Sequence, residues 1–301
     1  MAQFNFKAIG TSWVIDIYKE IDSVNESEIF AKIMNRIDVF DKAYSRFRSD
    51  STVSQITKKA GEYEFPADAK LLFETYYDLY KKTDGYFTPL VGQILVDAGY
   101  DANYSLKQKG ELQLPPKWED MMEFKPANDS NSNILNVEKP IQLDFGAAGK
   151  GYIIDLVGKI LEENGYENYC IDAGGDILHN NKKTIRVGLE DPENADQVIG
   201  VYELGNESIC GSAGNRRRWG NFTHIMNPKT LASPTDIIAV WVIADSALVA
   251  DALTTCLFFV KPESLMHSKL NGTGYKFEYF ILYKDRSFKK SDNFKGEVFV
   301  G

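Results

Sequence analysis

The sequence predicts an α+β fold in which mixed β-sheets are flanked by helices, and two kinds of segment lead to this prediction. Short segments that alternate apolar and polar residues, such as residues 14–18, are typical of strands. Longer segments carry apolar residues three and four positions apart, which indicates helices with one buried face. The chain of 301 residues holds no internal repeat and no low-complexity tract. We therefore expect a single domain over residues 1–301.

The first hundred residues predict one strand and two long helices. Residues 14–18 form the opening strand. Ser27 can cap a helix whose apolar positions, across residues 29–40, recur at helical spacing. A second helix is expected over residues 69–82, and Asp84-Gly85 should end it in a turn.

The middle of the chain predicts an irregular segment followed by a βαβ unit. Residues 101–139 are polar and rich in turn residues, so we expect an irregular excursion there. The chain returns through an apolar strand at residues 141–145, a turn of small residues and a helix that ends near Gly165. With a strand at residues 169–173, these elements predict the βαβ unit. The remaining expected elements are strands over residues 184–189, 197–204, 237–243, 277–283 and 297–300, and a helix over residues 247–258.

The composition argues against several classes of protein. Hydrophobic residues make up 44% and charged residues 26%, which is ordinary for a globular protein. The net charge of −9 argues against a nucleic-acid binder, because phosphate backbones need a basic face. The longest apolar span, residues 237–260, is interrupted by Asp245 and Asp251, so we expect no membrane span. Residues 1–10 hold no apolar leader, which favours a cytoplasmic protein.

The stretch around which the chain is organised is L-D-F-G-A-A-G-K-G-Y-I-I-D, residues 143–155. Small residues between a strand and a helix let a ligand approach the backbone closely. The free N–H groups of the helix suit a phosphate, to which Lys150 adds a positive charge and Asp144 an acceptor. The alternative is a tightly packed turn with a solvated lysine, because neither common phosphate-binding fingerprint is present.

Asp251 and Thr255 form a second informative pair. They lie four residues apart, so one face of the expected helix at residues 247–258, which Asp245 or Ser246 can cap, carries both oxygens. Mg²⁺ prefers such hard ligands, with water and substrate phosphate completing its coordination. The alternative is a solvated aspartate beside a threonine that bonds to its own backbone.

His224 is a candidate base, because it lies in an apolar run just before Asn227-Pro228. If it faces the phosphate site, it can accept the proton of a hydroxyl nucleophile; otherwise it is a hydrogen-bonded structural residue. His179 and His267 lie in polar contexts typical of the surface. Phe87, beside Tyr86, can flank a planar ring or belong to the core. These features together suggest a Mg²⁺-assisted reaction at a phosphate or pyrophosphate.

The motifs also occur in an order that resembles the family of FAD:protein FMN transferases, the ApbE family. The likeness spans residues 9–258, and seven motifs in order carry it. They are G-T-S-W at 10–13, S-R-F-R-S-D-S-T-V-S at 45–54, D-G-Y-F-T-P at 84–89, the L-D-F-G-A-A-G-K-G-Y core at 143–152, D-A-G-G-D at 172–176, S-A-G-N-R-R-R at 212–218 with H-I-M-N-P at 224–228, and D-A-L-T-T at 251–255.

The resemblance implies a Mg²⁺-dependent reaction on FAD. A serine or threonine hydroxyl of an acceptor flavoprotein would attack the flavin-side phosphorus, AMP would leave, and FMN would stay joined through a phosphoester. Positioning and charge neutralisation would supply most of the rate. One alternative is an FAD pyrophosphatase, in which water replaces the hydroxyl and the products are FMN and AMP. The other is a non-catalytic flavin-binding or carrier protein.

The resemblance also implies roles for individual residues in a ligand cleft between two interleaved lobes. Asp251, Thr255 and the carbonyl of Ala147 would hold Mg²⁺, with Thr254 as a further ligand. His224 would be the base, so His224 and Asp251 are the expected catalytic residues. The residues expected to contact FAD are Phe87, Thr88, Asp144, Lys150, Arg218, His224 and Ile225. Thr88 stands where the family has an aspartate.

Overall fold

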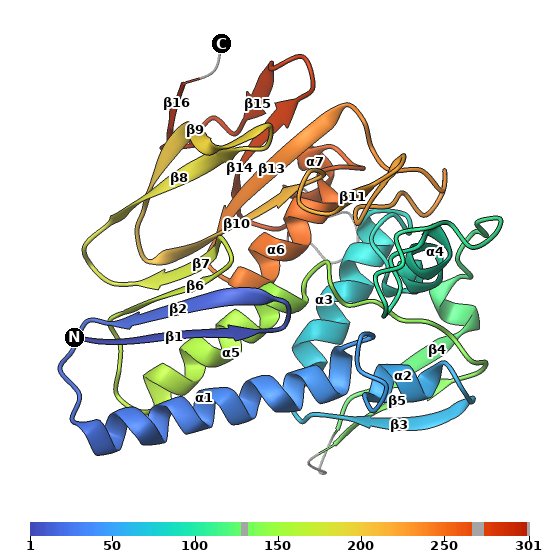
Figure 1. Cartoon of the computed structure of the whole chain (residues 1–301), viewed down its shortest axis with the longest axis horizontal. Helices are drawn as coiled ribbons and strands as arrows, with labels where there is room; N and C mark the ends of the chain where they lie inside the picture. The colour runs from blue at the N-terminus through green and yellow to red at the C-terminus, as the bar shows by residue number, and fades with distance from the viewer. Residues whose placement is uncertain (128–131, 267–273, 300–301) are drawn as a thin grey trace.

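The computed structural model describes residues 1–127, 132–266 and 274–299, and it contains two lobes (Figure 1). The expected α+β class, with sheets flanked by helices, is confirmed. The turn-rich residues 128–131 and His267 lie outside the described residues. No helix in the described ranges has both the length and the apolar character needed to cross a bilayer.

The larger lobe is built on an eight-stranded sheet. Its order is β1-β2-β6-β7-β10-β13-β14-β15, and each pairing within it is antiparallel. The strands are β1 (Ala2–Ala8), β2 (Thr11–Ile17), β6 (Tyr169–Ala173), β7 (Asp176–Asn180), β10 (Glu207–Ala213), β13 (Ile237–Ala244), β14 (Glu278–Tyr283) and β15 (Phe288–Lys290).

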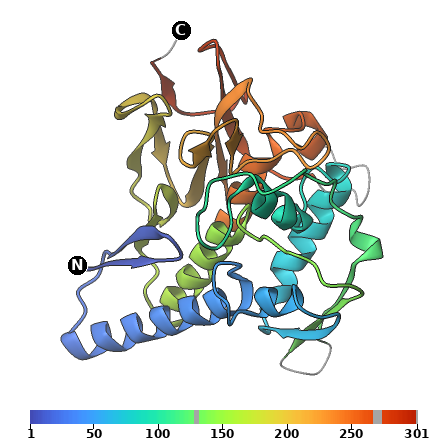
Figure 2. The ribbon, with the colours of Figure 1, turned by 45° about the vertical axis from the view of Figure 1, so that its right-hand side comes forward.

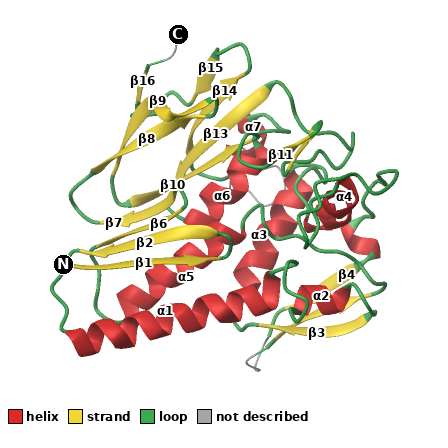
Figure 3. Cartoon of the chain, in the orientation of Figure 1, coloured by secondary structure: helices red, strands yellow, loops and turns green. Residues whose placement is uncertain are grey.

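Helices cover one face of this sheet, as Figures 2 and 3 show. They are α1 (Ser23–Tyr44), α5 (Gly149–Glu163) and α6 (Ala247–Cys256), and α7 (Pro262–Met266) follows α6. The opposite face carries a three-stranded sheet of β8 (Ile185–Asp191), β9 (Asn194–Leu204) and β16 (Glu297–Val298). Leu189, Ile199 and Tyr202 of this sheet pack on Ile209, Ile243 and Phe280 of the large sheet. The large sheet is therefore buried on both faces over its central strands.

The second lobe is inserted between α1 and α5. It contains a three-stranded sheet in the order β3-β5-β4 and several short helices. Its elements are α2 (Thr52–Ile56), β3 (Gly61–Phe65), α3 (Ala69–Lys82), η1 (Pro89–Val91), α4 (Gly92–Ala98), η2 (Trp118–Asp120), β4 (Met122–Lys125) and β5 (Asn133–Val137). A separate hairpin of β11 (Arg218–Trp219) and β12 (Phe222–Thr223) lies between β10 and β13 in the sequence. One apolar core runs through both lobes, so the expected single domain stays consistent with the fold.

The predicted strand at residues 141–145 is wrong, and so is the βαβ unit. The segment has no regular secondary structure and belongs to no sheet. Its side chains Leu143 and Phe145 are buried, and the amide of Asp144 donates to the carbonyl of Pro89 at 2.8 Å. The segment therefore lies against the start of η1, and β6 pairs antiparallel with β2 and β7 instead.

Three other expectations need correction. The excursion at residues 101–139 contains η2, β4 and β5, and its two strands pair with each other. The sequence reading missed β1, which pairs with β2 along its whole length. Asp22, not Ser27, caps α1, because its carboxylate accepts from the amides of Val24 and Asn25.

Candidate active site

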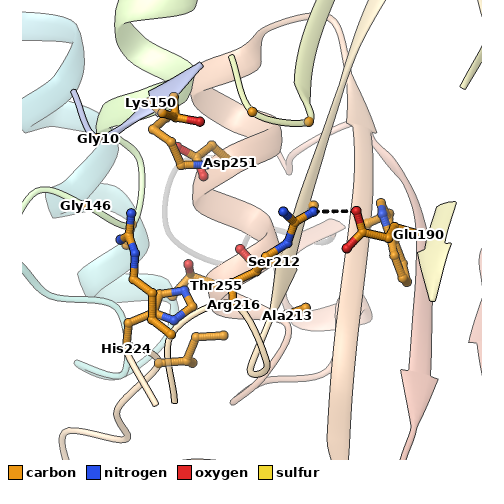
Figure 4. Close-up of a pocket in the computed structure, with 18 of the residues that line it drawn as sticks. Gly10, Gly146, Lys150, Glu190, Ser212, Ala213, Arg216, His224, Asp251 and Thr255 are labelled. Carbon is orange, nitrogen blue, oxygen red and sulfur yellow. Dashed lines mark hydrogen bonds and ion pairs between the residues drawn. The ribbon is translucent and has the colours of Figure 1, made fainter. Parts of the chain in front are cut away.

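A cavity of about 810 Å³ lies between the two lobes. Residues from β2, the loop before η1, the start of α5, the turn between β6 and β7, β10 and α6 line it. Figure 4 shows Lys150, His224, Asp251 and Thr255 around this space. Nine of the residues singled out from the sequence line the cavity: Phe87, Thr88, Asp144, Ala147, Lys150, His224, Ile225, Asp251 and Thr255.

Helices α5 and α6 hold each other at the floor of the cavity. The Asp251 carboxylate on α6 accepts from the amide of Gly151 in the first turn of α5, at 2.9 Å. In return, Asp155 of α5 accepts from the amides of Ala247 and Leu248 at 2.8 and 2.9 Å, and from the Ser246 hydroxyl at 2.7 Å. Each helix thus accepts hydrogen bonds from amides at the start of the other helix, which have no partner within their own helix.

Gly151 is required by this arrangement. A Cβ at this position would lie 2.0 Å from the carbonyl oxygen of Ala247 and 2.8 Å from the Cβ of Asp251. Only glycine lets the two helix backbones approach so closely. Gly151, which follows Lys150 in the sequence, therefore has a packing role that fixes the position of Asp251.

Asp251 is a buried carboxylate, with 3% of its surface exposed. Burial raises its pKa, and the neighbouring Lys150 ammonium opposes that shift. Lys150 also forms an ion pair with Asp176, whose second oxygen accepts from the amide of Gly211 at 3.0 Å. Sequence reasoning found Asp176 as a motif residue but missed its role as the partner of Lys150.

Asp144 is engaged by a buried arginine. Its carboxylate pairs with Arg46, which is nearly fully buried, and accepts from the amide of Gly146 at 2.7 Å. The Arg46 guanidinium also donates to the carbonyl of Tyr100 at 2.7 Å and lies 4.2 Å from the ring centroid of Phe47. The sequence reading treated this arginine only as part of a motif, since a separation of 98 positions from Asp144 hides the pairing.

His224 is neutral at pH 7. Its pKa falls to about 4, mainly because burial disfavours the charged ring, and the charges of Arg217 and Lys150 lower it further. Its Nδ1 atom is buried and has no hydrogen-bond partner in the described part of the chain. The backbone amide donates to the carbonyl of Arg217 at 3.2 Å, which fixes the residue beside the arginine cluster. A neutral imidazole in a cavity can accept a proton.

Two of the residues singled out do not line the cavity. Thr254 belongs to α6, and its side chain is fully buried. Its hydroxyl donates to the carbonyl of Asp251 at 2.6 Å and lies 2.8 Å from the Ser212 hydroxyl. Arg218 is exposed on the β11–β12 hairpin. Arg216 and Arg217 line the cavity in its place, and Arg216 pairs with Glu190 at 3.0 Å, as the dashed line in Figure 4 marks.

The apolar candidates contribute mostly packing. Phe87 is 1% exposed, and its ring lies 4.7 Å from that of Tyr76. The Thr88 hydroxyl accepts from the amide of Leu90 at 3.2 Å and so caps η1. Ile225 is buried beside His224. All three reach the cavity wall, but the hydroxyl of Thr88 already has a structural partner.

Within the described ranges, no group of three or more His, Cys, Asp or Glu residues could hold a metal ion. His179, expected at the surface, is instead buried in β7, where its Nδ1 lies 2.8 Å from the carbonyl of Gly205.

The fold and the cavity together define a class: an α+β protein with a polar cleft between two interleaved lobes. The chain belongs to the ApbE family, whose sequence profile matches residues 9–272. A protein named FAD:protein FMN transferase from Escherichia coli K12 is 24% identical over 279 residues, which cover 85% of this chain and 78% of that protein. A protein with the same name from Chlamydia muridarum is 27% identical over 269 residues, which cover 83% and 78%.

Solved structures show the same fold. An ApbE protein from Thermotoga maritima matches with a TM-score of 0.75 and 23% identity over 97% of each chain. The flavin transferase ApbE from Vibrio cholerae matches with a TM-score of 0.71 and 18% identity over 96% of each chain. The expected family is therefore confirmed by sequence and by fold.

Proposed function

We propose that this protein is a Mg²⁺-dependent transferase that moves FMN from FAD to a serine or threonine hydroxyl of an acceptor flavoprotein and releases AMP. The observation that carries the proposal is the meeting, in one cavity, of a buried carboxylate, an ammonium group and a neutral imidazole, from Asp251, Lys150 and His224. The names of the relatives support the choice of FAD as the donor and of a protein as the acceptor.

The oxygens around Asp251 fit a hard divalent cation. The carboxylate of Asp251, the hydroxyl of Thr255 and the backbone of Ala147 border the same cavity, and all three are oxygen donors of the kind Mg²⁺ prefers. One protein carboxylate is typical where water and substrate phosphate complete the coordination. Thr254 is left out of this set, because its hydroxyl is already bonded to Ser212 and to the backbone.

When bound there, Mg²⁺ would neutralise charge on the pyrophosphate of FAD. The hydroxyl oxygen of the acceptor forms a bond to the flavin-side phosphorus, and the bond from that phosphorus to the bridging oxygen breaks. The bridging oxygen leaves with AMP, and His224 takes the proton of the hydroxyl. A histidine that is uncharged at pH 7 is ready for this role without prior loss of a proton.

Other residues hold the donor in position. Lys150, fixed by Asp176, presents its positive charge at the start of α5, where the helix dipole also favours a phosphate. Arg217 also lines the cavity and adds positive charge, while the charge of Arg216 is offset by Glu190; these two residues replace Arg218 in our assignment. Asp144 is oriented by Arg46 and is the acceptor available to the flavin or ribose portion.

Incubation with FAD, Mg²⁺ and a candidate acceptor flavoprotein tests the proposal. Transfer gives an acceptor whose flavin survives denaturation and whose mass rises by that of an FMN group. Free FMN and AMP without a labelled acceptor would identify a pyrophosphatase, and recovery of intact FAD would identify a carrier. Either of these two results would refute the transferase assignment.

A further inference from the structure

The cavity extends beyond the residues placed around FAD. It continues past the Gly174-Gly175 turn as a groove along the outer face of the large sheet. One wall consists of Val14, Asp16, Cys170, Asp172 and Ile177 from β2, β6 and β7. Val14 lies opposite Asp172 in the strand register and Asp16 opposite Cys170, so these side chains form one continuous surface.

The other wall of the groove is the free edge of a strand. In the order β16-β9-β8, β8 is paired on one side only among the residues that the structure describes. Four consecutive residues of β8, residues 185–188, line the groove. Because successive side chains of a strand point to opposite faces, consecutive lining residues mean that the backbone edge itself faces the groove. Such an edge offers N–H and C=O groups to another extended chain.

The groove carries an excess of negative charge. Asp16 and Asp172 lie on the sheet wall, where they accept from the Gln3 amide and the Gly175 backbone amide rather than from a cation. Glu190 is neutralised by Arg216. Arg186 is largely exposed and lies 3.4 Å from Glu203 of β9. An occupant with basic side chains therefore complements this surface.

We propose that the groove binds an extended, basic segment of the acceptor protein, which adds to the free edge of β8 as a further strand. This inference rests on the proposed function, because it gives the acceptor a route to the site. Main-chain pairing provides affinity without a strict sequence requirement, and the carboxylates of Asp16 and Asp172 favour a segment with basic side chains. The pairing of β8 with β9 becomes irregular on both sides of Glu190. The added strand would therefore end there, close to Arg216 and the cavity.

Two synthetic peptides of about ten residues, the upper length of an ordinary strand, test this docking site. Each carries one threonine, and the polar positions are lysine in one peptide and glutamate in the other. With FAD and Mg²⁺ present, we expect the lysine peptide to slow hydrogen exchange at residues 185–189 and to bind about tenfold more tightly than the glutamate peptide. The variant Asp16→Lys should abolish this preference.

The matched control is Glu64→Lys, which changes the charge by the same two units. Glu64 is exposed on β3 and does not line the groove, so this variant should leave the preference intact. Absence of binding, unchanged exchange at residues 185–189, or equal affinities for both peptides would overturn the proposal. So would light scattering that shows a second copy of the chain on this edge. Flavin transfer to the threonine is measured separately: protection without transfer counts against the proposed function, and transfer without protection counts against the docking site.

Discussion

The substitution Gly151→Ala tests whether the contact between α5 and α6 sets the geometry of the site. The added Cβ would lie 2.0 Å from the Ala247 carbonyl oxygen, whereas carbon and oxygen atoms in van der Waals contact lie more than about 3 Å apart. The obstacle is backbone, and Asp155 holds the amide of the same residue at 2.8 Å. The helices must therefore separate by about 1 Å.

The cost can be estimated from general values. Overpacking a buried contact typically costs about 1–3 kcal/mol, and more where backbone must move. Replacing glycine by alanine within a helix returns up to about 1 kcal/mol. Because the obstacle here is backbone, the cost lies at or above the upper end of that range, and we expect a net loss of at least about 2 kcal/mol in the free energy of unfolding. Mg²⁺ binding should weaken as well, because Asp251 moves with its helix.

Urea unfolding followed by tryptophan fluorescence measures this change, and Gly149→Ala is the matched control. That glycine lies in the same helical turn, and its Cβ would meet only the tip of the Phe40 ring at 3.3 Å. We expect the control to stay within about 1 kcal/mol of the natural protein. Equal unfolding midpoints for the two variants would refute the reasoning.

Four further predictions concern the residues of the site. Asp251→Asn keeps an oxygen for the Gly151 amide, so the protein should remain folded. Calorimetry should show loss of Mg²⁺ binding, and assays should show loss of flavin transfer. Retained transfer at low Mg²⁺ would contradict the metal assignment. Thr255→Val should weaken Mg²⁺ binding about tenfold, because its hydroxyl faces the cavity. Thr254→Val should instead lower the free energy of unfolding by about 1 kcal/mol and leave the Mg²⁺ affinity unchanged. The reverse pattern would exchange the roles of the two threonines. His224→Gln should lower the transfer rate at least about 100-fold with little change in FAD affinity. Because the folded pKa of His224 is about 4, below its unfolded value, the unfolded chain binds more protons, and stability should fall as the pH drops from about 6.5 towards 4. In urea titrations at several pH values, His224→Gln should reduce the pH-dependent change in the free energy of unfolding by roughly 1–2 kcal/mol, after allowance for partial exposure of the ring. If stability depends on pH equally in the variant and the natural protein, the ring titrates normally.

Local signals predicted local features well. The helix α3 has the bounds that its apolar spacing and terminal turn indicate, and Ser246 caps α6 through a bond from the Val249 amide. The spacing of four residues predicted that Asp251 and Thr255 share one face of the helix, and both line the cavity. These features depend on helical periodicity and capping, which a few neighbouring residues determine.

Features that depend on distant partners escaped prediction. The apolar run at residues 141–145 resembles a strand, but whether its amides pair with a sheet depends on segments elsewhere, and here Pro89 receives one of them. The partners of Lys150 and Asp144 lie 26 and 98 residues away. Thr254 and Thr255 are adjacent in sequence, so the sequence does not distinguish their roles. The structure does, because the Thr254 hydroxyl is bonded to Ser212 whereas Thr255 lines the cavity.

The exchange of acceptors between α5 and α6 has a consequence for how this site can change. The carboxylate proposed to bind the metal also satisfies an amide of the opposite helix, so a substitution there alters both metal chemistry and helix termination. An engineer who wishes to alter the metal preference must retain an oxygen in that place. Evolution faces the same constraint, which ties the chemistry of the cleft to the integrity of the domain.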